Sequence, residues 1–229
     1  KETSYIIQLL HVGVPAHVYW GKKIRSSGLS SILQRVERCS FSPNPFPEDM
    51  SISYDTLPQE YPAYGVGDFR HPAYQIQAEN GTTASEAIYD KHRIYKGKPS
   101  LEGLPSTYVE HEDEAETLEL ELYDATAGMR IILSYTVFNE LNAITRSVRF
   151  INEGTESFRL LRGLSMSIDF RDSNYDLLHL SGSWARERYM ERRALASGMQ
   201  GVESRRGASS HAHNPFLALL SKGADEDHG

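Results

Sequence analysis

The chain has 229 residues, one cysteine and a formal net charge of −7, with 39% hydrophobic and 24% charged residues. This length suits one large all-β domain or two small ones and allows a sizeable core, while the negative charge disfavours a nucleic-acid partner. A single cysteine excludes an internal disulfide. Since no signal peptide and no membrane-spanning stretch is recognisable either, we expect a cytoplasmic protein with no membrane partner.

The N-terminal part alternates short strands with irregular chain. Residues 5–10 and 17–20 have the composition of two strands, which Gly13 and Pro15 separate. The stretch 35–50 contains three prolines, which supply no backbone donor to a β-ladder, and it therefore predicts a long loop. Long loops in compact domains are often functional.

The segment 61–72 is dense in aromatic, glycine and proline residues. Such a composition predicts a packed loop, and Asp68 and Arg70 are placed within it to form a buried ion pair. Paired buried charges mostly fix loop geometry, so we expect this pair to be structural and not catalytic.

The clearest strand patterns lie in the middle of the chain. Residues 117–123 place Leu118, Leu120 and Leu122 on one face. Residues 158–170 alternate over a greater length, which predicts one long, half-buried strand. Turns recur about every ten residues and no helical pattern is comparable, so we expect an all-β, antiparallel sandwich. Further strands are expected at 74–78, 88–95, 130–138, 143–151 and 217–220.

The stretch 181–216 combines a tryptophan with a cluster of arginines and glutamates. A flat indole such as Trp184 can pack on sugar C–H groups while neighbouring guanidinium groups bind the hydroxyls. In the alternative interpretation the tryptophan is core and the charges form a solvated face, and residue types alone favour this alternative. The arginines are Arg186, Arg188, Arg192, Arg193, Arg205 and Arg206.

Other candidate sites are weaker. The acidic run that includes His111 is better explained as a solvated loop, and His211 with His213 lack further ligands at suitable spacing. We therefore expect no metal and no cofactor. Cys39 has no nearby histidine pattern that would activate it. The sequence carries no nucleophile elbow, phosphate loop or dinucleotide fingerprint, and it singles out no carboxylate pair for glycoside hydrolysis.

Several longer motifs, taken together and in order, carry a resemblance over essentially the whole chain. They resemble the N-terminal domain of bacterial α-galactosidases of glycoside hydrolase family 36. The motifs are AHVYWGK (16–22), FSPNP (41–45), LPQEYPAYG (57–65), DFRHPAY (68–74), HRIYKGKPSLEGLPSTYVE (92–110), EAETLELEL (114–122), ITRSVRF (144–150), YDLLHLSGSWARER (175–188) and ESRRGASSHAHNPF (203–216).

The resemblance implies a β-supersandwich domain over residues 1–229. It implies a retaining parent enzyme that hydrolyses terminal α-galactosyl groups of oligosaccharides such as raffinose and melibiose. In this family the catalytic aspartates, a nucleophile and an acid/base, lie in a (β/α)8 barrel that follows the sandwich. The resemblance therefore places no catalytic residue in this chain, and the chain alone is expected to be inactive. It also implies a homo-oligomer, a tetramer in the full-length protein.

Two residues take a sugar-binding role by resemblance. The family has an Arg-x-Asp-Arg loop just before FSPNP, and the corresponding residues here are 35–38, with Glu37 in place of the aspartate that binds sugar hydroxyls. Trp184 matches the family's tryptophan that lines the sugar pocket. Loops of this domain help to wall active sites, including that of a neighbouring subunit, so we expect the arginines of 181–216 to form contacts between domains or subunits.

Two alternatives of another class stay open. A free-standing carbohydrate-binding module would bind galactosides by itself. A purely structural or oligomerisation domain would bind no sugar but would still self-associate.

Overall fold

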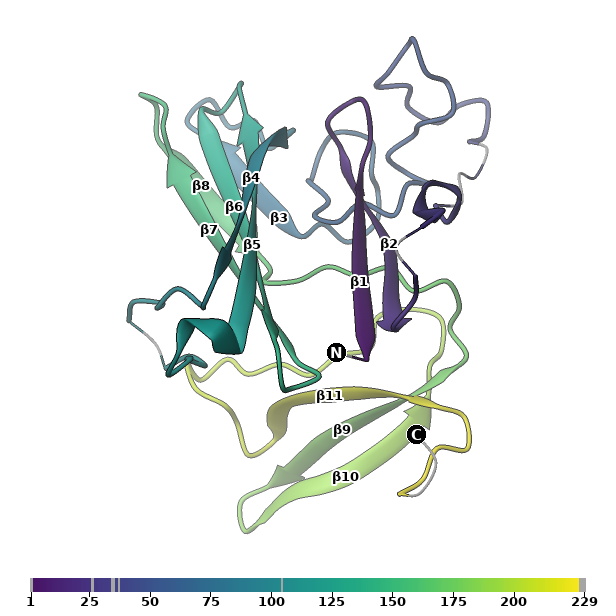
Figure 1. The fold of residues 1–229 in the computed structure, drawn as a ribbon, viewed down its shortest axis with the longest axis vertical. Coiled ribbons are helices and arrows are strands. Elements are labelled where there is room, and N and C mark those ends of the chain that lie inside the picture. The colour runs from purple at the N-terminus through teal and green to yellow at the C-terminus, as the bar shows by residue number, and fades with distance from the viewer. Residues whose placement is uncertain (1, 26, 34–35, 37, 104, 227–229) are drawn as a thin grey trace. The chain divides into compact units, whose positions relative to one another are not determined.

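The computed structural model of the chain describes residues 2–25, 27–33, 36, 38–103 and 105–226 (Figure 1). The chain forms two compact units, residues 1–169 and 170–229. The regular structure of these described residues consists of strands β1 to β11 and two short 3₁₀ helices, Leu29–Ser31 and Glu112–Glu114. All the paired strands are antiparallel, so the predicted all-β, antiparallel fold class is confirmed. Among the described residues, no helix is long and apolar enough to cross a membrane.

The first unit contains three antiparallel sheets. A four-stranded sheet has the order β4-β5-β6-β7, and the pairs β1-β2 and β3-β8 form two small sheets. The strands are β1 (Thr3–Leu9), β2 (Pro15–Lys22), β3 (Tyr74–Ala78), β4 (Ile88–Lys96), β5 (Ala115–Asp124), β6 (Met129–Phe138), β7 (Ile144–Asn152) and β8 (Phe158–Gly163). The strands predicted at 5–10, 17–20, 74–78, 88–95, 117–123, 130–138 and 143–151 are confirmed to within a few residues at their ends.

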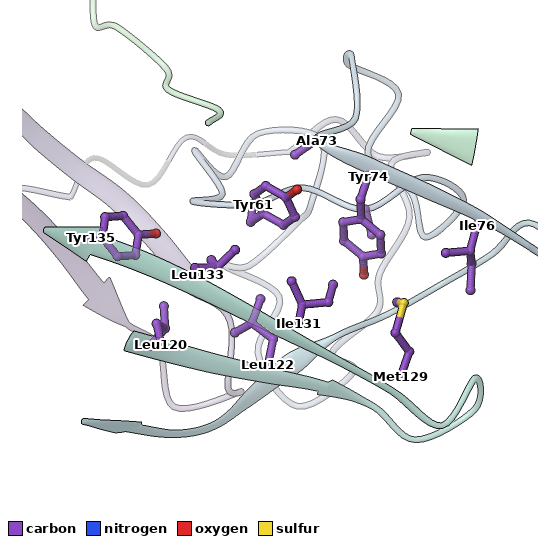
Figure 2. Packing of buried hydrophobic residues seen from close by; sticks show 11 residues of the cluster. Tyr61, Ala73, Tyr74, Ile76, Leu120, Leu122, Met129, Ile131, Leu133 and Tyr135 are labelled. Atoms are coloured by element: carbon purple, nitrogen blue, oxygen red, sulfur yellow. The ribbon is translucent and has the colours of Figure 1, made fainter. Parts of the chain in front are cut away.

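The main core lies on one face of the four-stranded sheet. Leu120 and Leu122 of β5 pair with Leu133 and Ile131 of β6, so their side chains share that face, as the leucine alternation predicted. Figure 2 shows these side chains beside aromatic and aliphatic residues of β3 and of the segment before it. Burial of this apolar surface is the main source of the unit's stability.

The expectation of one strand over residues 158–170 is wrong beyond Gly163, where β8 ends. The partner strand β3 pairs only as far as Tyr74 with Gly163. Pro72 lies just before β3 and has no backbone N–H, so it cannot extend the ladder. Met166 and Phe170 of the predicted apolar face remain largely exposed. An alternating pattern therefore extended past the point at which a strand partner exists.

Most of the first unit between β2 and β3 is irregular. No strand lies in the described part of the proline-rich stretch 36–50, which confirms the predicted loop. Polar groups fix this region where ladders do not. The carboxylate of Asp55 accepts hydrogen bonds from Ser42 Oγ (2.6 Å) and Ser53 Oγ (2.5 Å), and Ser42 and Asp55 are 13 residues apart in the sequence.

A buried charge cluster joins this irregular region to two sheets. Glu60 has no solvent exposure, and its Oε1 accepts hydrogen bonds from Tyr5 Oη (2.6 Å) and Tyr135 Oη (2.8 Å). Arg146 Nη2 lies 3.0 Å from the same oxygen, and His17 Nδ1 lies 3.2 Å from Oε2. Tyr5 and His17 belong to the N-terminal hairpin, whereas Tyr135 and Arg146 belong to the large sheet. One carboxylate thus connects three parts of the unit.

The second unit contains β9 (Tyr175–Ser183), β10 (Arg186–Ala194) and β11 (His213–Ser221) in the order β10-β9-β11. The strand expected at 217–220 is confirmed within the longer β11. Strands β9 and β10 were not predicted. Every residue of β10 is exposed, and charged side chains occupy both of its faces, so it carries no alternating apolar signal.

We expect Glu60→Gln to lower the free energy of unfolding by about 3 kcal/mol, because it leaves the buried Arg146 guanidinium without its counter-charge. Urea unfolding followed by circular dichroism measures this change. Glu102→Gln is the matched control, since Glu102 is exposed. An unchanged urea midpoint for Glu60→Gln would contradict the account of the cluster.

Five tyrosines should make the fold sensitive to alkali. Burial is the main cause that raises the pKa of each phenol well above its ordinary value of 10. The stability that these phenols contribute is present in full below pH 10. It is lost at higher pH, by about 1.4 kcal/mol per group per pH unit, because the unfolded chain releases the protons first. The residues are Tyr5, Tyr54, Tyr61, Tyr74 and Tyr135.

In a pH titration that follows phenolate absorbance and circular dichroism together, these tyrosines should ionise in one step with loss of the fold. Gradual ionisation of all tyrosines near pH 10, with the circular dichroism unchanged, would be the contrary result.

Candidate functional site

Trp184 lies at the tip of the β9–β10 hairpin in the second unit. Ser183 pairs with Arg186, so Trp184 and Ala185 form a two-residue turn between the strands. The indole side chain belongs to a residue that is 83% exposed. A tryptophan in a core would be buried, so core packing within the described part of the chain does not explain this side chain. The exposed ring can offer its face to a ligand or to another protein surface.

The local backbone holds this tip in an uncommon conformation. Ala185 has a φ of 60°, in the left-handed region, and its N–H donates to Glu187 Oε1 at 2.9 Å. Two residues further on, Arg188 also has a positive φ of 62°, at the point where the strand register shifts between Arg186 and Tyr189. A side chain at Gly182 would collide with the carbonyl oxygen of Arg186. Only glycine therefore permits this close approach of the two strands.

The arginines around the hairpin divide into two groups. Arg192 forms an ion pair with Asp176 at 2.8 Å and also donates to the carbonyl of Ala224. Arg205 pairs with Glu203 at 3.3 Å in a fully solvated setting. For the other arginines no ion pair is found within the described residues; these are Arg186, Arg188, Arg193 and Arg206. Their guanidinium groups can interact with groups outside this unit.

Sequence reasoning missed His179 in the middle of β9. The residue is 4% exposed, and neither ring nitrogen has a hydrogen-bond partner among the described residues. Its Nε2 lies 3.5 Å from Glu191 Oε2, and its ring is perpendicular to that of His213. A hydrogen bond from Ser181 lowers the pKa of Glu191. His179 lies between Leu178 and Leu180, and Glu191 comes opposite it only through the pairing of β9 with β10, so the sequence carries no signal that identifies this cluster.

The Asp68 and Arg70 side chains lie together in the first unit. Arg70 Nη2 is 2.8 Å from Asp68 Oδ2, and the same nitrogen donates to the carbonyl oxygens of Tyr54 and Leu57. Gln59 Nε2 donates to the same Asp68 oxygen at 2.8 Å. Asp68 is buried and Arg70 is partly exposed. All these contacts tie one loop to another, and none of them leaves the carboxylate free for a reaction.

The loop expected to contact sugar lies in the irregular part of the first unit. Glu37 falls outside the described residues. Its neighbour Arg38 donates from Nη1 to the carbonyl of Ser42 at 2.9 Å, and Cys39 Sγ lies 3.0 Å from Ser42 Oγ. Val36 and Phe41 are exposed, so this loop presents two apolar side chains to the outside beside the polar residues between them.

Two further features do not point to catalysis. Glu110, His111 and Glu114 bring ligand atoms within 4.8 Å of one another, but exposed acidic groups of this kind are common without an ion. A hollow of about 520 Å³ next to β1 is lined mainly by aliphatic side chains such as Ile94, Leu118 and Val137. Such a lining supplies few of the donors and acceptors that a sugar needs.

Known proteins resemble this chain over its whole length. α-Galactosidase AgaA of Geobacillus stearothermophilus is 57% identical over 228 residues, which are 100% of this chain and 31% of the relative. The bifunctional α-galactosidase/sucrose kinase AgaSK of Mediterraneibacter gnavus is 38% identical over 229 residues, covering 99% of this chain and 24% of the relative. The chain therefore spans about a third of the length of AgaA and about a quarter of that of AgaSK.

Solved structures give the same result. A crystal structure of Geobacillus stearothermophilus AgaA in complex with raffinose superimposes on 98% of this chain with a TM-score of 0.94 and 57% identity, covering 31% of that protein. The α-galactosidase of Lactobacillus brevis matches 95% of this chain with a TM-score of 0.90 and 37% identity, covering 29% of that protein. The family model for the glycosyl hydrolase family 36 N-terminal domain matches residues 13–229. The chain belongs to the family of glycosyl hydrolase family 36 N-terminal domains.

Proposed function

We propose that this chain is the non-catalytic N-terminal domain of a retaining α-galactosidase that removes terminal α-galactosyl groups from oligosaccharides of the raffinose type. Support comes from relatives named α-galactosidases, which the chain matches over about a quarter to a third of their length. One of them was crystallised with raffinose and another form of it with stachyose. The two compact units then belong to one domain over residues 1–229, since a single family model extends from residue 13 to residue 229.

The observation that carries the proposal is the exposed indole of Trp184 at a hairpin tip. A side chain with 83% exposure is free to contribute a wall to a pocket completed by another part of the protein. An indole face suits the C–H groups of a galactosyl ring, and the arginines nearby can bind hydroxyl oxygens. We assign Trp184 to the galactoside pocket on this basis.

We assign hydrolysis of the glycosidic bond to a part of the parent enzyme outside this domain. Retaining hydrolysis needs two carboxyl groups about 5 Å apart across the scissile bond. By family resemblance this pair lies in a (β/α)8 barrel, and the buried carboxylates of Glu60 and Asp68 are engaged in structural contacts. The barrel is therefore the main partner of this domain. The resemblance also supports a homo-oligomer, a tetramer, in which Glu37 and the loop around it wall an active site. A cytoplasmic location stays a prediction.

A sugar-binding module is the second candidate, because an exposed tryptophan is also what such a module uses. A module needs an aromatic platform complete in one chain. The described part of the second unit offers one indole at the hairpin tip with charged neighbours, so the pocket-wall role is the better supported of the two.

Trp184→Ala should lower kcat/KM of the intact enzyme for raffinose about tenfold, because loss of an aromatic contact with the sugar costs about 1.4 kcal/mol. Steady-state kinetics with raffinose measures this. Met190→Ala, in the exposed strand β10 that follows, is the control and should keep the wild-type value. Equal kinetics of Trp184→Ala and wild type would rule out the pocket role.

Gly182→Ala should have a similar kinetic effect, because a methyl group at residue 182 must push the strand that carries Arg186 away and displace the hairpin tip. Gly201→Ala is a matched control in the same unit, since a side chain there meets nothing within 4 Å. If both variants keep the wild-type kcat/KM for raffinose, the hairpin geometry does not position Trp184 for the substrate.

A further inference from the structure

We propose that the outer face of β6 and β7, away from the main core, binds a small oxyanion of the phosphate or sulfate type through the Lys98 ammonium group and a block of hydroxyl groups. A cavity on this face is lined by Lys98 and by serine and threonine residues of β6 and β7, and it has a volume of about 120 Å³. This volume corresponds to roughly four water molecules, which is the scale of one tetrahedral oxyanion. The site lies entirely within the first unit and is independent of Trp184.

The hydroxyl block follows from the strand register. Ser134 pairs with Ser147 and Thr136 pairs with Thr145, so four hydroxyl side chains share one face of two adjacent strands. Residues between them, such as Tyr135, face the core and the Glu60 cluster. All four residues line the cavity. The alternation of the two strands therefore separates a hydroxyl face from an apolar face.

The chain that follows β4 brings Lys98 to this block. Thr117 Oγ1 lies 2.8 Å from Thr136 Oγ1 and donates to the carbonyl of Gly97 at 2.7 Å, which fixes the start of this segment on the sheet. Lys98 lines the cavity, and its ammonium group makes one long hydrogen bond of 3.4 Å, to the carbonyl of Pro99. Among the described residues, no other acceptor binds the Lys98 ammonium group, so its other donors are available.

The hydroxyl groups are available as well. Because Thr117 donates its hydroxyl proton to Gly97, Thr136 donates its own to Thr117. Ser134, Thr145 and Ser147 make no side-chain hydrogen bond among the described residues. Half-buried hydroxyls without a protein partner are suited to donate to a ligand. With Lys98 they form a set of donors around one small cavity, and hydrogen bonds to a charged acceptor are the stronger kind.

The charge of the site favours an anion over a neutral sugar. No carboxylate and no aromatic ring occurs among the described residues that line the cavity. Glu119 of β5 is the direct partner of Ser134 on the same face, but Arg93 and Tyr95 already donate hydrogen bonds to its carboxylate, and Arg93 neutralises its charge. Arg146 also lines the cavity, but its guanidinium group is engaged by Glu60. Of the two basic residues described in the cavity lining, Lys98 is therefore the one whose N–H donors are mostly available.

The test uses isothermal titration of the intact protein with inorganic phosphate and, separately, with sulfate, at an ionic strength fixed with sodium chloride. We expect saturable binding and a rise of the unfolding temperature that depends on the anion concentration. Lys98→Met should weaken binding about tenfold or more, because it removes the charge and keeps most of the stem. Ser147→Ala should weaken it less.

Lys91→Met is the matched control. Lys91 lies on the same outer face, on β4, and pairs with Glu121 at 3.7 Å, so its loss should leave phosphate binding unchanged. Three outcomes would overturn the proposal: no saturable binding of either anion, equal binding by wild type and Lys98→Met, or an equal loss in Lys91→Met and Lys98→Met. Since none of these readouts uses galactoside hydrolysis, they stand or fall separately from the proposed enzyme function.

Discussion

A carboxylate with no exposure to water has to be neutralised by its neighbours, and Glu60 finds those neighbours on four different strands. Tyr5 and His17 come from the N-terminal hairpin, whereas Tyr135 and Arg146 come from the large sheet. Burial of a single charge costs several kcal/mol unless its partners are correctly placed. The cluster therefore favours one arrangement of hairpin, sheet and irregular segment over others in which the same apolar surfaces could meet.

Backbone contacts act in the same direction. The N–H of Glu60 donates to the carbonyl of Pro15 at 2.9 Å, and the N–H of His17 donates to that of Pro58 at 2.7 Å. Residues 58–60 thus add to the edge of β2 through a single bridge between Ala16 and Gln59, without forming a regular strand. Further along, the Asp68 carboxylate with Arg70 fixes the next loop. The long irregular region is held by buried polar groups, which fix its loops where no regular ladder does.

In the second unit, backbone sterics fix the shape of the β9–β10 hairpin. Gly182 lets the chain of β10 approach β9 closely, and the left-handed conformation of Ala185 turns the chain immediately after Trp184. The resulting exposure of an indole has a cost in water, because a large apolar surface is left solvated. A contact between the indole and a surface outside the unit would bury the ring and offset this cost.

Physical reasons explain which features could be predicted. Strands β5 and β6 alternate over a buried face, and both were predicted. The same rule failed at 164–170, since alternation cannot reveal that the partner strand β3 begins only at Tyr74, opposite Gly163. Strand β10 has charges on both faces and carried no signal. At the site, residue types drew attention to Trp184, but the Glu60 cluster could not be predicted, because its members are spread over more than 140 residues of sequence.

We propose that this domain supplies part of a galactoside pocket and does not bind the sugar alone. Isothermal titration of the 229-residue chain with raffinose, beside the intact enzyme under the same conditions, tests this most directly. Circular dichroism of the chain verifies that it is folded. The account predicts binding by the intact enzyme and no detectable heat with the chain alone. Saturable binding by the chain that is lost in Trp184→Ala would contradict it, and the domain would then be a carbohydrate-binding module.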